Sequence, residues 1–211
     1  MQVAARFRLA AAILRRDAAL RRGAKRMPKP APWDWVEPRL LPLLAGPCLP
    51  EEPDEVVRTT APPGCAVLIG VDVGGAFLYV DELVAERWER STDQLLAAAM
   101  HNLRRRASRI PNHHVVTGTL SGHIVRTIRR PAWVSSLVLA PDQLMRLFGH
   151  QDQLIAVPGR GLVVSFPADM PTIVAAETVV DLEMADPEPL MLNPFAIERG
   201  ELIWEPIEDV A

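Results

Sequence analysis

Two apolar runs joined by a turn-forming tetrapeptide constrain the fold of this chain more than any other stretch. The runs are residues 154–157 (LIAV) and 162–166 (LVVSF), and Pro158-Gly159-Arg160-Gly161 lies between them. Proline fixes φ for the first position of a turn, and glycine permits positive φ. Because so short a connection joins antiparallel neighbours, this stretch predicts a β-hairpin.

A strand and a helix are predicted just before this hairpin. Residues 136–140 form an apolar run, and Pro141 and Asp142 suit the first turn of a helix. Gly149 can end that helix by adopting positive φ. The helix has apolar positions that recur at helical spacing, namely Leu144, Leu147 and Phe148.

A longer helix is expected over 92–108. Ser91 and Gln94 have the spacing of a capping box, in which each side chain bonds the backbone of the other residue. The apolar positions at helical spacing are Leu96, Met100, Leu103 and Ala107. Asn102 is a poor helix former within this segment, and we expect it to bond neighbouring backbone.

A second long helix and several short hairpins complete the predicted elements. Asp169 and Pro171 favour a helix over about 171–184, with Ile173, Ala176, Val180 and Met184 along one side. Hairpins are predicted around Gly74-Gly75, around residues 120–122 and around Gly200. Short connections between most strands favour an α+β fold, with a mainly antiparallel sheet and both long helices on one face.

Length and proline content suggest one domain with appendages. The 211 residues are 49% hydrophobic and 5% aromatic, so aliphatic side chains must fill a single core. Ten of the 20 prolines lie between Pro28 and Pro63, where they remove backbone donors. We therefore expect a basic arm at 1–26, a Pro-rich connecting segment at 27–63 and the α+β domain at 64–211.

The arm is a predicted amphipathic basic helix. Residues 1–30 carry nine Lys or Arg and one acid, Asp17, whereas the rest of the chain is strongly acidic. The apolar positions of the arm are Phe7, Ala10, Ile13, Leu14 and Leu20. The uncharged run between Arg8 and Arg15 is too short for a signal-peptide core or a membrane span.

Several roles stay open for the arm. It can pack on its own domain, remain solvated, or make weak contact with an anionic membrane surface. The acidic body of the chain disfavours a nucleic-acid partner. From Glu177 onward there are ten acids and one Arg, so this end can neutralise the arm.

We expect residues 1–26 to be dispensable for folding. A transit peptide, if the source is eukaryotic, and a start at Met27 are alternatives.

No metal or cofactor is expected. Cys48 and Cys65 lie far apart without a CxxC partner, which disfavours a zinc site or a disulfide framework and favours a reduced, cytoplasmic setting. His113, His114 and His123 can approach one another across a hairpin, but no metal-ligand spacing enforces this. We expect surface or hydrogen-bonded histidines.

Two charged motifs have plain structural interpretations. The stretch VDVGG, which contains Asp72, resembles the phosphate-binding hairpin of the actin, sugar-kinase and hydantoinase superfamily. That fold requires two large domains, so we expect ordinary hairpin chemistry here. The arginines at 104–106 and Arg109 complement the C-terminal dipole of the predicted helix, which we favour over nucleic-acid binding.

The candidate site is centred on Arg160, with His150 and Asp152 as possible partners. Arg160 is either an exposed turn residue or a planar fork that binds a carboxylate or phosphate. No nucleophile–base motif, P-loop or complete Rossmann fingerprint is present. The preferred function is a non-catalytic protein- or peptide-binding adaptor, and the alternative is an enzyme or anionic small-ligand binder at Arg160.

Three stretches together resemble the bacterial YtpP-like family. They are YVDELVAERWERSTDQLLAAAMHNL, LVLAPDQLMRL and LIAVPGRGLVVSF, and the resemblance covers roughly residues 65–205. In that family a strand and a following Trp lead to a helix with an Asn-Leu pair, here Asn102-Leu103. A later strand ends in Val-Pro-x-Arg, here Val157 to Arg160, and then Asp, where this chain has Gly161. The resemblance implies the same order of elements and no established activity.

Overall fold

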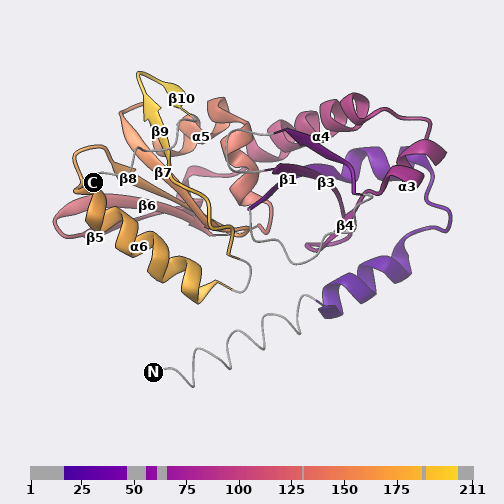
Figure 1. Cartoon of the computed structure of the whole chain (residues 1–211), viewed down its shortest axis with the longest axis horizontal. Helices are drawn as coiled ribbons and strands as arrows, with labels where there is room; N and C mark the ends of the chain where they lie inside the picture. Colours follow the sequence, from indigo (N-terminus) through magenta and orange to yellow (C-terminus); the bar gives the residue numbers. More distant parts are fainter. Residues whose placement is uncertain (1–16, 47–55, 61–65, 130, 187–188, 204–211) are drawn as a thin grey trace.

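The computed structural model describes residues 17–46, 56–60, 66–129, 131–186 and 189–203 (Figure 1). Two antiparallel sheets with helices around them form an α+β fold, which confirms the predicted fold class. The helices after the helical stretch 17–26 are α2 (Trp33–Val36), η1 (Glu37–Arg39), α3 (Glu82–Arg87), α4 (Thr92–Ala107), η2 (Asn112–His114), η3 (Val134–Leu139), α5 (Pro141–Phe148) and α6 (Thr172–Ala185). The strands are β1 (Leu40–Ala45), β2 (Arg58–Thr60), β3 (Ala66–Asp72), β4 (Phe77–Tyr79), β5 (Val115–Leu120), β6 (His123–Arg129), β7 (Gln153–Gly159), β8 (Leu162–Pro167), β9 (Phe195–Glu198) and β10 (Glu201–Ile203).

The four-stranded sheet begins inside the segment that was interpreted as connecting. Its order is β1-β3-β2, and β4 also pairs with β3. All six residues of β1 are buried, so this part of the Pro-rich stretch belongs to the folded body. Pro42 is compatible with the strand because β1 lies at the sheet edge, where a missing N–H need not break a ladder. The high proline content of this segment therefore obscured a short apolar strand that itself contains one proline.

The six-stranded sheet contains the predicted hairpin. Its order is β10-β9-β7-β8-β6-β5, and β7 and β8 pair from Gln153↔Pro167 to Gly159↔Leu162. The glycines of this turn do not adopt positive φ. A Cβ on Gly159 would instead lie 2.3 Å from the Asp186 carboxylate, so the close approach of that side chain accounts for a glycine here.

The predicted helices are present, but one predicted strand is not. The capping box of Ser91 and Gln94 begins α4, and α5 ends at Gly149, which has a φ of 100°. Residues 134–139 form the 3₁₀ helix η3 where a strand was expected over 136–140. A short apolar run fits a buried helical turn as well as a buried strand, so its pattern could not decide.

Helices cover both faces of the six-stranded sheet rather than one. On one face, β7 contributes Ile155 and Val157 to a core shared with η3 and α5. On the other, Ala156 contacts a cluster that includes Ala175 and Val179 of α6. Alternate residues of a strand point to opposite faces, so α6 lies across the sheet from η3 and α5. The cluster that contains Ile155 and Val157 also includes residues of β1 and α4, and it therefore joins the two sheets in one core.

The side of α6 that was singled out in the sequence faces solvent. Ile173 is 66% exposed, Val180 52% and Met184 83%. The helix packs instead through Ala175 and Val179, which are 2% and 6% exposed. Because α6 has apolar residues on two sides, helical spacing alone selected the wrong one.

The arm is described only from residue 17. Residues 17–26 are helical, and Gly23 is buried against Val73, whose carbonyl oxygen would lie 2.4 Å from a Cβ at residue 23. Positions 1–16, which include Phe7 and Leu14, lie outside the described residues. No helix within the described ranges is long and apolar enough to cross a membrane.

Candidate ligand-binding pocket

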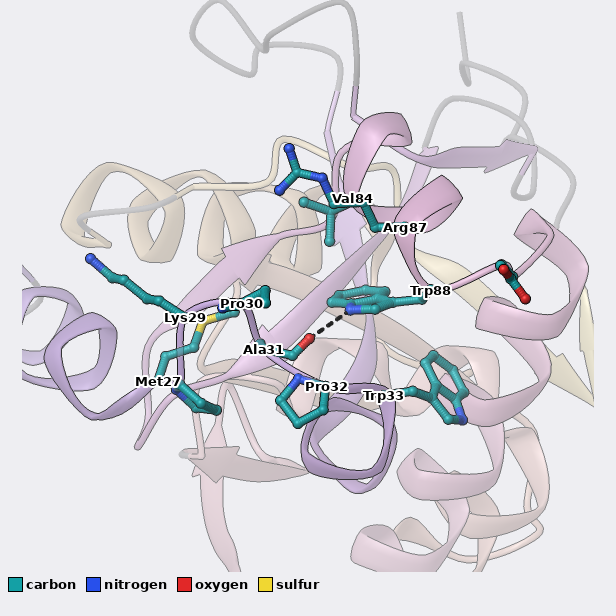
Figure 2. Close-up of a pocket in the computed structure, with 11 residues that line it drawn as sticks. Met27, Lys29, Pro30, Ala31, Pro32, Trp33, Val84, Arg87 and Trp88 are labelled. Carbon is teal, nitrogen blue, oxygen red and sulfur yellow. Dashed lines mark hydrogen bonds between the residues drawn. The ribbon is translucent and has the colours of Figure 1, made fainter.

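An open pocket lies between the segment that precedes α2 and the end of α3 (Figure 2). Its volume is about 940 Å³. One wall is the chain from residue 27 to residue 33, and the other is built from α3 and the two residues that follow it. The lining residues are Met27, Pro28, Lys29, Pro30, Ala31, Pro32, Trp33, Val84, Arg87, Trp88 and Glu89.

The two walls are held together by Trp88. Its indole N–H donates to the Ala31 carbonyl oxygen at 2.9 Å, a bond between residues far apart in the sequence. The Trp33 ring lies 6.0 Å from the Trp88 ring at an interplanar angle of 57°. Asp81 caps α3 by accepting the Val84 N–H at 2.7 Å, which fixes the wall that carries Trp88. The indole donor is thereby used within the fold, and the parts of both rings that line the pocket offer apolar contact.

The edge of the pocket is charged. Lys29, Arg87 and Glu89 are exposed, and Figure 2 shows the charged ends of Lys29 and Arg87 directed away from the Trp88 ring. Neither cation makes an ion pair with any residue that the structure describes. The guanidinium of Arg90 lies 4.9 Å from the Trp33 ring centroid and supports that ring. An apolar floor with two available cations suits a ligand that is apolar at one point and anionic at another.

Arg160 is a buried residue. Arg160 is 8% exposed, and its guanidinium lies 5.5 Å from the Tyr79 ring centroid. Its carbonyl oxygen accepts the Ser135 N–H at 3.2 Å. The expectation of an exposed turn residue is therefore wrong, because the turn folds against β4 and η3 instead of projecting into water.

His150 and Asp152 are not near Arg160. Both are exposed and precede β7, whereas Arg160 follows it. A strand of seven residues spans about 23 Å, so the two groups lie at opposite ends. Asp152 Oδ1 accepts the Arg199 N–H at 2.9 Å and thus bonds the β9–β10 turn. The structure does not bring the three proposed site residues together.

Asp72 stabilises its own hairpin. Its Oδ1 accepts the N–H groups of Gly74 and Gly75, both at 2.9 Å, and Oδ2 pairs with Arg106. Burial acts to raise the pKa of this carboxyl, but bonds from Gly75, Arg106 and Gly74 outweigh it, so the pKa of Asp72 lies below its ordinary value. The carboxylate is fully engaged within the fold, as ordinary hairpin chemistry requires.

The arginines near the end of α4 are also largely engaged. Arg104 lies 4.0 Å from the Asp142 carboxylate, Arg105 donates to Asn102 Oδ1 at 3.1 Å, and Arg106 pairs with Asp72. These internal partners agree with a structural role for the cluster.

The histidines do not form a metal centre in the part of the chain that the structure describes. His113 and His114 are exposed and contact each other edge to face, with centroids 4.8 Å apart. His123 lies 3.6 Å from Asp169 Oδ1. No group of three or more His, Cys, Asp or Glu within the described ranges could hold a metal ion. Cys48 and Cys65 lie outside those ranges.

Sequence reasoning did not find the pocket. A signal was present, because Trp33 and Trp88 are large amphipathic residues beside proline and charged residues, a composition typical of binding surfaces. The contact between Trp88 and Ala31 joins segments 57 residues apart, which no local pattern reveals.

No family model, curated protein or solved structure matches this chain.

Proposed function

We propose that this chain is a non-catalytic binding module, and that its pocket beside Trp33 and Trp88 receives a short peptide segment of a partner protein. The open aromatic and proline-lined pocket with Lys29 and Arg87 at its edge is the observation that supports this function. A bacterial, cytoplasmic setting is part of the proposal, supported by the resemblance to the YtpP-like family and by the isolated cysteines.

The chemistry of the pocket supports one kind of peptide. An aliphatic or proline side chain can lie against the Trp33 and Trp88 rings and remove apolar surface from water. A carboxylate next to that side chain can then pair with Arg87 or Lys29, and Arg87 can bind it through two parallel N–H bonds. Glu89 disfavours a second acid at its own side of the edge. We therefore propose a peptide with one apolar anchor and one neighbouring acid.

The alternative, an enzyme or anionic small-ligand binder at Arg160, has less support. Its guanidinium is buried over Tyr79, and neither His150 nor Asp152 is available to complete a site there.

Peptide binding can be tested with Arg87→Glu. Immobilised short peptides that combine aliphatic or proline residues with acids are screened against the full chain, and the peptides that bind are titrated by fluorescence anisotropy. Loss of a charge-assisted hydrogen bond weakens binding by about tenfold or more. Arg109→Glu is the matched control, since Arg109 is exposed at the far end of α4 and does not line the pocket.

A second variant separates the apolar contact from the charge. Trp33→Ala removes one ring of the floor without removing the bond between Trp88 and Ala31. We expect it to weaken the same peptides as Arg87→Glu while Arg109→Glu binds as the wild type does. If no peptide binds, or if Arg87→Glu and Arg109→Glu behave alike, the proposed function is wrong.

A further inference from the structure

Helix α6 presents an uncovered apolar row on the outside of the molecule. It lies along the six-stranded sheet at the periphery (Figure 1), and it buries Ala175 and Val179 against that sheet. Ile173, Val180 and Met184 lie on its other side and are 66%, 52% and 83% exposed. These positions, with the exposed Ala176, recur at i, i+3, i+7 and i+11 and so form one stripe along the helix.

A helix with two apolar sides is normally covered on both. Surface helices usually carry charged and polar side chains opposite the core, whereas the outer row of α6 consists of aliphatic residues and a methionine. The row is continuous over the length of the helix, which distinguishes it from scattered apolar residues on a surface. This pattern indicates a docking surface for another helix.

The charge beside the row indicates the kind of helix. Glu177 and Asp181 are exposed on the same side of α6, and the chain has no Lys or Arg between Arg160 and Arg199. Pairing two copies of α6 would place like charges together, which is unfavourable. A basic amphipathic helix would instead pair its cations with these carboxylates.

The sequence of the chain itself predicts such a helix. Phe7, Ala10 and Leu14 have the i, i+3 and i+7 spacing that would put them on one side of a helix, and residues 1–16 carry four Arg and no acid. As a helix, residues 3–16 would have the same length as the 14 residues of α6, about 21 Å. We propose that the outer face of α6 is the docking surface for residues 3–16 of the same chain, with the arginines of this segment facing Glu177 and Asp181.

Hydrogen exchange of the full-length chain tests the proposal from both partners. Val180→Asp on α6 and Leu14→Asp on the arm each place a charge in the apolar contact. We expect either change to accelerate amide exchange across residues 3–16 by on the order of tenfold. The matched controls are Val116→Asp, at a 62% exposed valine on β5, and Leu9→Asp, at a position that helical spacing puts outside the apolar row of the arm. Both controls should leave exchange unchanged.

Oxidation of methionine provides a second readout on α6. If the arm covers the row, dilute peroxide should oxidise Met184 more slowly than Met191 in the wild type, although Met191 is less exposed in the structure, at 53% against 83%. Leu14→Asp should reverse that order, and Leu9→Asp should not. Thermal melts establish that every variant remains folded.

Three results would overturn the proposal. The first is equal exchange across residues 3–16 in the Val180→Asp and Val116→Asp variants. The second is a wild-type assembly of two chains that dissociates in Val180→Asp, which would place the arm on another copy. The third combines two observations: the wild type binds vesicles of phosphatidylglycerol, and Met184 is oxidised freely when no vesicles are present. Together these would assign the arm to an anionic membrane.

Discussion

Asp72 couples the stability of the β3–β4 hairpin to pH. Its carboxylate accepts two glycine N–H groups and pairs with Arg106, and its pKa lies below the ordinary value because these partners outweigh burial. A carboxyl with a lowered folded-state pKa binds protons less readily when folded than when unfolded. Its contribution to stability is therefore complete above the unfolded pKa, about 3.9, and is lost as the pH falls through the lower folded value.

Asp72→Asn should therefore flatten the acid side of the stability profile. We expect the variant to be less stable than the wild type at pH 7, because Arg106 loses its anionic partner while the amide oxygen can still accept the glycine N–H groups. The difference should shrink as the pH falls, as protonation removes the same charge from the wild type. Urea denaturation at a series of pH values measures this. A stability difference that does not change with pH would contradict the role assigned to Asp72.

Asn102 shows what a sequence can and cannot predict at one residue. An amide inside a helix was expected to bond backbone, and its Nδ2 does donate to the carbonyl oxygens of Glu37 and Leu40, at 2.6 and 3.1 Å. These acceptors lie 65 and 62 residues earlier in the chain, so only the fold identifies them. The sequence predicts that a buried polar group has a partner, because an unpaired one is costly, but it does not predict which partner.

At the scale of elements, local signals predicted more than tertiary ones. The capping box, the proline at the start of α5 and the β7–β8 turn act within a few residues, and each gave the observed element. Strand β1 and the outward row of α6 were missed because both depend on what lies alongside in space. The pocket was missed for the same reason, because its walls come from two segments that are far apart in the sequence.

The end of β1 offers a sharp steric test. A Cβ added to Gly46 would lie 1.7 Å from the Leu190 carbonyl oxygen, so backbone would have to move. We expect Gly46→Ala to destabilise the protein by about 1–3 kcal/mol, the usual range for overpacking, as measured by urea denaturation.

Gly118→Ala is the matched control for this change. Gly118 lies within β5, and a Cβ there would meet no atom within 4 Å. Alanine restricts the unfolded chain more than glycine does, so Gly118→Ala should be neutral or stabilising by up to about 1 kcal/mol. If the two substitutions have equal effects, the close packing of Gly46 on Leu190 is not a constraint on the fold.

At the scale of the whole molecule, Arg160 connects the two sheets. It follows β7 of the six-stranded sheet, and its guanidinium lies over Tyr79 of β4 in the four-stranded sheet. Together with the core cluster that includes residues of both sheets, this contact favours unfolding of the described body as one unit.

A double-mutant cycle measures that connection. Arg160→Ala and Tyr79→Leu should each destabilise the protein, and their combined loss should be smaller than the sum by about 0.5–2 kcal/mol, the energy of a partly buried cation–π pair. Thermal and urea melts of the four proteins supply the coupling. Arg109→Ala, at an exposed arginine, should show no coupling with Tyr79→Leu. Additive losses at residues 79 and 160 would show that the contact does not link the sheets.

The position of β5 at the edge of the six-stranded sheet has a consequence for solution behaviour. One side of this strand pairs with β6, and its other row of backbone donors and acceptors has no neighbouring strand among the described residues. Its sequence, VVTGTL, contains no charged residue and no proline, the devices by which proteins usually protect such edges. We therefore expect chains to join edge to edge through this strand in concentrated solutions. The substitution Thr117→Lys should raise the concentration up to which the protein stays free of aggregates.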